Sequence, residues 1–250
     1  MSEASREAKL NAAFVKLADT LTADYDVVDL LHTLVVECTE ILDTQAGGLL
    51  LVDSAGRLQL VASTSEQVGL VEVMQVNAGA GPCMDCFASG VAVAVDDIEK
   101  HGSKWPAFQA SALEQGFKSV FATPMKLRGN IIGTMNLLST SVGVLNARDA
   151  AVAQALTDVA TIGILQERMI SESGIVTEQL QSALDSRILI EQAKGVLSQT
   201  ESISMDQAFA TLRSYARRKN LTLRFVAEGV TNRSLDVFAD SRSGGEGRTD

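Results

Sequence analysis

Two cysteines three positions apart, Cys83 and Cys86, are the residues of this sequence best placed to carry out chemistry. Such a pair can exchange thiols for a disulfide or supply two soft ligands to a metal. The third cysteine and both histidines are distant in sequence and unpaired in spacing, so no metal site is expected. The preceding Gly-Pro fits a turn that leads into a helix. We expect a structural role for the pair, with a reversible thiol switch as the alternative.

No other arrangement of residues suggests catalysis. The sequence has two histidines, no serine or cysteine nucleophile elbow, no glycine-rich phosphate loop and no His-Glu-x-x-His motif. We therefore expect no catalytic residues, no bound cofactor and no enzyme activity.

Length and composition limit the number of domains and the location of the protein. Its 250 residues fit one large domain or, more comfortably, one unit of about 150 residues plus a smaller one. No apolar run approaches the roughly 18 residues that span a membrane, and the polar N-terminus lacks a signal-peptide pattern. Three cysteines, an odd number, argue against a disulfide framework. These features favour a cytoplasmic protein with no membrane partner.

The charge of the chain changes sign near its end. Residues 1–170 hold 11 basic against 20 acidic side chains, whereas residues 186–235 hold eight basic against four acidic ones. No acid occurs from Gln207 to Ala227. A basic segment in a protein of net charge −10 is either a solvated helix face or a contact for phosphates.

The first two thirds of the chain show helices at both ends of a run of strands. Helical spacing over residues 7–44 predicts two helices that meet near residues 22–26. Alternating or continuous apolar runs predict strands, and a further helix follows them over residues 148–170. This order favours an antiparallel α+β sheet over a doubly wound one. The predicted strands are 48–52, 58–62, 71–76, 91–95, 119–125 and 131–138.

The last third reads as helical throughout. An apolar residue recurs every seven positions, as in a paired, coiled-coil-like signalling helix. Three short amphipathic helices follow over 186–199, 204–219 and 223–230, with Ser204 and Gln207 spaced for an N-terminal cap on the second. The heptad residues are Ile162, Met169, Val176, Ala183 and Ile190.

Residues 187–230 resemble the ANTAR domain of transcription antiterminators. The resemblance implies a dimeric three-helix module that binds paired RNA hairpins in nascent transcripts and prevents a terminator from forming. It is carried by Glu191-Gln192-Ala193-Lys194-Gly195, Ala208-Phe209, Leu212-Arg213, Ala216, Leu223 and Val226-Ala227.

Residues 10–168 resemble a GAF domain, which implies a sensory α+β fold and an unidentified small-molecule ligand. The pattern typical of cyclic-nucleotide-binding members is absent, and no cysteine is assigned to a bilin. The resemblance is carried by Gly81-Pro82-Cys83-Met84-Asp85-Cys86, Trp105-Pro106-Ala107-Phe108, Gly116-Phe117-Lys118-Ser119, Thr123-Pro124 and Gly129 through Ile132-Gly133-Thr134-Met135-Asn136-Leu137.

Together these features predict a homodimeric antitermination regulator. Its parts are a GAF sensor domain with an N-terminal helix (1–168), a helical linker (169–185), an ANTAR domain (186–236) and a disordered tail (237–250). The alternative is a redox or metal sensor that uses Cys83 and Cys86 and signals through protein partners. The predicted RNA contacts are Arg187, Lys194, Arg213, Tyr215, Arg217, Arg218, Lys219 and Arg224.

Two of these contacts have a second interpretation. Tyr215 follows Leu212 by three residues, so it fits the edge of the helical core better than a surface for base stacking. Lys194 lies one turn from Arg187 and Glu191, and either an ion pair or a phosphate would satisfy it.

Gly195, inside a helix, costs about 1 kcal/mol relative to alanine and suggests close approach of another helix or of RNA.

Overall fold

The computed structural model describes residues 3–20, 27–53, 55–127, 129–143, 145–170 and 176–238. Within these ranges the chain divides into two units, Met1–Leu184 and Asp185–Asp250. The elements in chain order are α1 (Glu3–Thr20), α2 (Val27–Leu42), β1 (Ala46–Val52), β2 (Leu58–Ser63), α3 (Glu66–Ala78), α4 (Pro82–Ser89), β3 (Val93–Val95), α5 (Ile98–His101), η1 (Gly102–Lys104), α6 (Pro106–Glu114), β4 (Ser119–Leu127), β5 (Asn130–Ser139), α7 (Ala147–Ile170), α8 (Val176–Glu201), α9 (Met205–Lys219) and α10 (Leu223–Thr231).

The first unit is built on one antiparallel sheet with strand order β2-β1-β5-β4-β3. The predicted strand pairs 48–52 with 58–62 and 119–125 with 131–138 are confirmed as β1 with β2 and β4 with β5. β1 and β5 pair so closely that a Cβ at Gly133 would come 2.1 Å from the carbonyl oxygen of Leu50. Glycine is therefore required there to keep the central strands in register.

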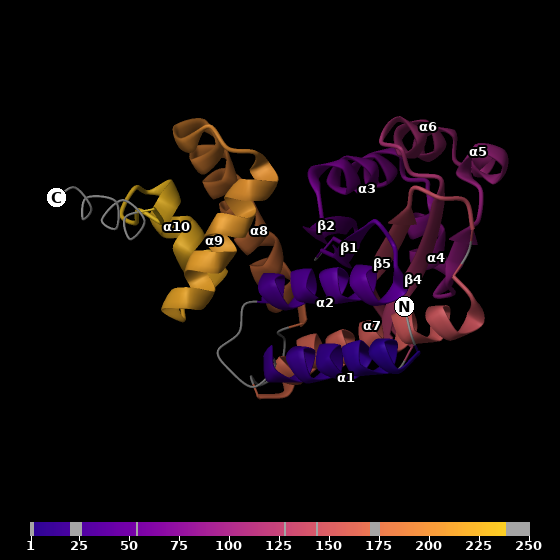
Figure 1. Cartoon of the computed structure of the whole chain (residues 1–250), viewed down its shortest axis with the longest axis horizontal. Coiled ribbons are helices and arrows are strands. Elements are labelled where there is room, and N and C mark those ends of the chain that lie inside the picture. Colours follow the sequence, from indigo (N-terminus) through magenta and orange to yellow (C-terminus); the bar gives the residue numbers. More distant parts are fainter. Residues whose placement is uncertain are drawn as a thin grey trace. The chain divides into compact units, whose positions relative to one another are not determined.

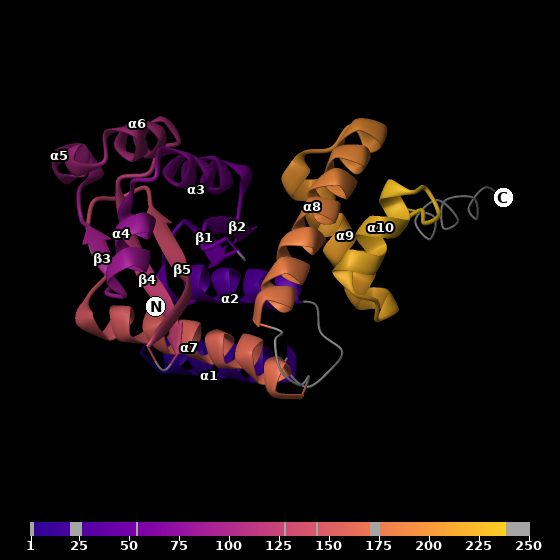
Figure 2. The same cartoon turned by 180° about the vertical axis from the view of Figure 1, so that it is seen from behind.

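Helices cover both faces of this sheet (Figure 1 and, from behind, Figure 2). α2 and α7 pack on one face, with α1 against both of them, while α3 and α4 pack on the other and α6 lies against α3. On the α3 side, the rings of Trp105 and Phe108 meet edge to face with centroids 6.4 Å apart. Both side chains belong to a buried apolar cluster that also includes Val68 and Val71.

One predicted strand is wrong. Residues 71–76 belong to the helix α3, which begins after Ser65 and ends at Gly79. The Ser65 hydroxyl accepts a hydrogen bond from the Val68 N–H, and Gly79 takes the left-handed conformation (φ 62°) that closes the helix. The valines of this segment suggested a strand, but Val68, Val71, Glu72 and Gln75 are buried at helical spacing.

The second unit contains α9 and α10 and the larger part of α8, which begins at Val176 within the segment predicted as a linker. Its apolar stripe includes Ile190, Ala193 and Leu197, all of which are buried. Ile190 is only 2% exposed, so the prediction that it faces a partner chain is wrong. Ile162 on α7 is 39% exposed, and the side chains of the three intervening heptad residues lie outside the described residues.

No helix in the described ranges is long and apolar enough to span a lipid bilayer.

Candidate functional site

The helix α9 presents the basic segment. Its start is fixed by a capping box in which the Ser204 hydroxyl accepts from the Gln207 N–H (3.1 Å) and the Gln207 side chain accepts from the Ser204 N–H (2.9 Å). Asn220, in the left-handed conformation with φ 53°, ends the helix. Because both ends are fixed by short-range hydrogen bonds, the basic side chains between them sit on a well-defined helical frame.

Four of the predicted RNA contacts lie close together in sequence around the turn from α9 to α10. Arg217, Arg218 and Lys219 at the end of α9 are exposed, as is Arg224 at the start of α10. We call these four residues the cationic turn. Arg213 lies one helical turn before Arg217 on the same side of α9 and is half-buried. No acid occurs in the first turn of α10.

Two other predicted contacts lie inside the domain's own packing. The side chain of Lys194 is 7% exposed, and its ammonium bonds to Glu191 Oε2 at 2.9 Å and lies 6.0 Å from the centroid of the Phe209 ring. Arg187 has a side chain 20% exposed, with an ion pair of 3.9 Å to Glu191 Oε1. The ion-pair interpretation of Lys194 thus accounts for its position, and its charge is directed into the domain.

Tyr215 is half-buried, and cations cover its ring. The Arg218 guanidinium carbon lies 5.4 Å from the ring centroid and the Lys219 ammonium 6.0 Å from it. Both distances fall within the range of cation–π attraction. Tyr215 therefore serves to hold the two cations in place, in agreement with its core-edge spacing.

Phe225, which the sequence reasoning missed, is the exposed aromatic residue beside the cationic turn. Its side chain is 57% exposed, whereas Leu223 and Val226 on either side are 1% and 0% exposed. The signal was present in the sequence, because Phe225 falls off the apolar stripe of α10.

The first unit contains a buried polar cluster where α3 crosses the sheet. Glu72 Oε2 accepts hydrogen bonds from Asn136 Nδ2 (2.8 Å) and Gln75 Nε2 (3.1 Å), and Gln75 Oε1 accepts one from the Cys83 N–H (3.1 Å). Gly81 is needed here, since a Cβ would come 2.2 Å from Gln75 Oε1. This cluster joins α3, α4 and β5 through side chains. The sequence did not predict this cluster, because residues 71–76 were expected to form a strand.

Burial dominates the chemistry of Glu72. Desolvation raises the pKa of its carboxyl to about 8, although the hydrogen bond from Asn136 favours the ionised form. The carboxyl is therefore mostly protonated at neutral pH. Within the described residues Glu72 Oε1, Asn136 Oδ1 and Thr134 Oγ1 have no hydrogen-bonding partner.

The three cysteines are free, fully buried thiols. Desolvation raises the pKa of Cys38 and Cys83 far above the ordinary thiol range, and the neighbouring Glu72 adds to the effect at Cys83. The pKa of Cys86 is raised to about 12, chiefly by burial. Because the thiolate is the reactive form, these thiols are poor nucleophiles and poor metal ligands. In the described part of the chain, no group of three or more metal-ligating side chains is found.

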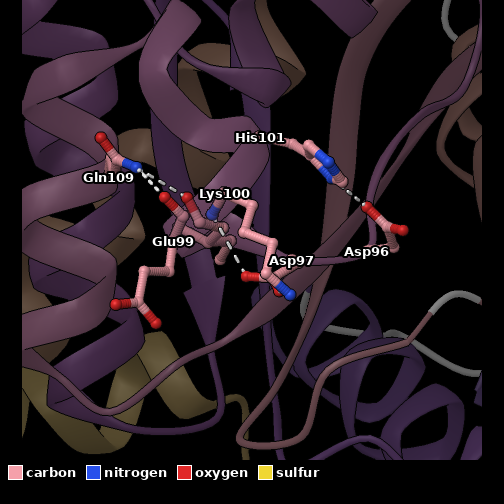
Figure 3. A network of polar contacts seen from close by, with 7 residues as sticks. Asp96, Asp97, Glu99, Lys100, His101 and Gln109 are labelled. Atoms are coloured by element: carbon pink, nitrogen blue, oxygen red, sulfur yellow. Dashed lines mark hydrogen bonds and ion pairs between the residues drawn. The ribbon is translucent and has the colours of Figure 1, made fainter.

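His101, the last residue of α5, forms a surface contact with Asp96 beside a second group of polar contacts (Figure 3). His101 Nδ1 lies 2.7 Å from Asp96 Oδ1, and this hydrogen bond lowers the pKa of Asp96. Lys100 and Asp97 form an ion pair of 2.8 Å, and Gln109 Nε2 donates to the carbonyl oxygens of residues 98 and 99. Gln109 thus fastens α6 to α5, and His101 ties the end of α5 to Asp96.

A cavity of about 350 Å³ opens beside the start of α7. Two carboxylates, Asp43 and Asp149, line it, and none of its lining residues is basic. Its volume suits a small molecule. The lining residues are Leu42, Asp43, Thr44, Ser119, Val120, Phe121, Leu137, Ser139, Ser141, Val142, Gly143, Leu145, Asn146 and Asp149.

Comparison with known families matches the two units separately. The sequence model of the GAF domain matches residues 24–164, more than half of the chain, and that of the ANTAR domain matches residues 178–230. The chain belongs to the GAF family and carries a C-terminal ANTAR domain. A GAF unit is a small-molecule sensor and an ANTAR unit an RNA-binding antitermination module, so both matched domains are regulatory.

Solved structures share the fold of the GAF unit. A free methionine-R-sulfoxide reductase from Neisseria meningitidis, solved with its substrate, is 19% identical with a TM-score of 0.52, over 68% of this chain and 95% of that one. The GAF domain of an Acinetobacter phosphoenolpyruvate-protein phosphotransferase is 14% identical with a TM-score of 0.52, over 70% and 100%. No curated protein sequence matches the chain. At such identities the likeness establishes the fold alone.

Proposed function

We propose that this GAF and ANTAR protein is a homodimeric regulator whose two ANTAR units bind a pair of RNA hairpins in a nascent transcript. The observation that carries the proposal is the cationic turn with Arg213, on a domain whose family binds RNA. Arginine and lysine neutralise phosphates and displace counterions, which supplies much of the affinity for nucleic acid. Once one ANTAR unit of the dimer has bound one hairpin, the second unit is held near the second hairpin. The high effective concentration raises the affinity for the paired hairpins.

The charge distribution supports this assignment. The remainder of the chain is acidic and repels a polyanion, so RNA is attracted to the C-terminal unit alone. Tyr215 holds Arg218 and Lys219 by cation–π contacts, which lowers the entropy that these side chains would lose on binding a phosphate. We leave Lys194 and Arg187 out of the proposed phosphate surface, because Glu191 pairs with both.

The proposed regulation is a population shift. A ligand bound in the GAF unit changes the equilibrium between two arrangements of α7 in the dimer, and so alters how the two ANTAR units are presented to RNA. The cavity beside the start of α7 is the proposed place of entry for such a signal. We propose the domain limits 1–168, 169–185, 186–236 and 237–250 for this mechanism.

Recovery of bound transcripts tests the proposed function directly. The full-length protein is pulled down with cellular RNA, and the bound leaders are mapped and then synthesised. We expect leaders with two adjacent hairpins, bound by a protein dimer with an affinity that falls steeply as salt rises. Equal affinity for a leader with one hairpin deleted would contradict binding to paired hairpins.

The alternative redox or metal sensor receives no support from the geometry of Cys83 and Cys86. Both are fully buried, and their raised pKa values keep them protonated near neutral pH.

A further inference from the structure

The exposed ring of Phe225 lies next to the cationic turn in the ANTAR unit. Single exposed apolar side chains are common on protein surfaces, so exposure by itself explains nothing. What distinguishes Phe225 is its setting: Arg224 precedes it directly, and the last residue of α9, Lys219, lies six positions earlier across a short turn. A large apolar ring thus occurs within the segment that is richest in positive charge.

The backbone holds this ring in a fixed place. The Phe225 N–H donates to Thr222 Oγ1 at 3.1 Å, which caps α10, while Leu223 and Val226 anchor the helix in the core of the domain. The ring therefore projects from the first turn of α10, and only two side-chain torsions remain to be ordered on binding. Such a rigid aromatic surface is suited to stacking.

The two aromatic rings of α9 are already in contact with cations. Phe209 lies under the Lys194 ammonium, and Tyr215 lies under Arg218 and Lys219. In the described part of the chain, Phe225 has neither a cation nor a second ring over its face. Among the described rings of α9 and α10, it is thus the one open to a new stacking partner.

We propose that Phe225 is a stacking site for an unpaired nucleobase of the RNA that the cationic turn holds by its phosphates. Hairpin loops contain unstacked bases that aromatic side chains can accept, and each base has a π-face whatever its sequence. The proposal rests on the proposed RNA function and adds a second kind of contact. Phosphates position the RNA, and the ring binds a loop base between them.

The test compares variants of the full-length protein that separate stacking from charge. Phe225→Ala should weaken binding of the recovered leader about tenfold, since stacking on one aromatic residue contributes about this much. The slope of affinity against salt should stay unchanged, because no phosphate contact is lost. Phe225→Tyr should keep the affinity, whereas Phe225→Leu, which retains apolar bulk without a π-face, should not. Leu70→Ala, which removes a 60% exposed apolar side chain from α3, is the matched control and should have no effect.

Substitutions in the RNA, combined with Phe225→Ala, complete a double-mutant cycle. Each loop nucleotide is replaced in turn by an abasic one, and one replacement should cost the wild type about tenfold while costing Phe225→Ala almost nothing more. A single-stranded oligoadenylate of about 12 nucleotides is the second probe, and it should also lose affinity in Phe225→Ala because stacking tolerates any sequence.

The outcomes separate this proposal from the proposed function. If Arg213→Ala with Arg217→Ala weakens RNA binding but Phe225→Ala does not, the stacking site is refuted and RNA binding stands. If neither variant changes the affinity, the RNA function of this face fails as well. Full rescue by leucine, or a monomeric Phe225→Ala protein in sedimentation, would make the ring a protein contact and overturn the proposal.

Discussion

The carboxyl group of Glu72 on α3 and the side-chain amide of Asn136 on β5 share a 2.8 Å hydrogen bond, although 64 positions separate them in the chain. Gln75 links the same carboxyl to the N–H of Cys83 at the start of α4. The pair therefore ties two helices to a central strand of the sensor unit. A change in the charge of Glu72 acts on all three elements.

The protonation of Glu72 should make the stability of the protein depend on pH. The folded-state pKa is about 8, whereas an unfolded glutamate has a pKa of about 4.3. Between these values the folded chain binds more protons than the unfolded chain, so the free energy of unfolding falls as pH rises. In Glu72→Gln this pH-dependent loss of stability is absent. The free energy of unfolding of the variant, relative to that of the wild type, should therefore rise by at least about 1 kcal/mol from pH 5 to pH 8, as measured by denaturant unfolding.

A matched exposed acid provides the control for that measurement. Glu114→Gln at the end of α6 should leave the pH profile of the wild type unchanged, since Glu114 is exposed. Parallel profiles for the wild type and Glu72→Gln would show that Glu72 does not titrate in this window.

The thiols should be unreactive in the native protein. Because Cys38, Cys83 and Cys86 are 0% exposed with raised pKa values, an aromatic disulfide reagent should titrate almost none of them before unfolding and all three in denaturant. The Cys83→Ser, Cys86→Ser protein should keep the dimer state and RNA affinity of the wild type in reducing and mildly oxidising buffers. Rapid labelling of two native thiols, or an oxidation-dependent RNA affinity, would favour the redox sensor instead.

The basic face of α9 should carry the salt dependence of RNA binding. Replacing Arg213 and Arg217 by alanine should weaken binding to the double-hairpin RNA at least about tenfold and reduce the salt slope, with the fold intact by circular dichroism. The control, Arg57→Ala, removes an exposed arginine of the sensor unit that pairs with Asp53 at 3.2 Å. It should change neither quantity, and a folded double variant with full RNA affinity would rule out this face.

Gly195 offers a test of close approach to α8. A Cβ there would meet no described atom within 4 Å, so no described part of the chain requires glycine at this position. Gly195→Ala should therefore stabilise the ANTAR unit by about 1 kcal/mol. If RNA approaches this position, the same change should weaken RNA binding at least about fivefold. Gln192→Ala at an exposed position of α8 is the control, and stabilisation with full affinity would exclude close approach by RNA.

The predicted linker, residues 169–185, should hold the dimer. Met169→Lys with Val176→Lys would place like charges opposite each other in a parallel pair, which should give a more monomeric protein with weaker binding to paired hairpins. Sedimentation across a range of protein concentrations measures this. An unaltered dimer with full RNA affinity would mean that other contacts, such as those of the GAF helices, hold the chains together.

Most of the architecture could be predicted from the order of the amino acids alone. Periods of two and near 3.6 residues located the strand pairs β1 with β2 and β4 with β5, and the long helix α7. Ser204 and Gln207 gave the start of α9, because a capping box needs only residues three apart. Such local signals do not depend on the rest of the fold. The same holds for the motifs that carried the two family resemblances, since they too are runs of neighbouring residues.

Features that depend on contacts between residues distant in sequence became visible only in the folded chain. Residues 71–76 form a helix because Val68, Val71 and Gln75 pack at helical spacing, which overrides the strand preference of valine. The raised pKa of Glu72 follows from burial beneath elements far along the chain. In the ANTAR unit, the side chain of Lys194 is buried and two cations lie over the ring of Tyr215. The side chain of Phe225 stays exposed. The type of a residue determines which interactions its side chain can make. Its burial and its neighbours in the folded chain determine whether the side chain can make them with a ligand.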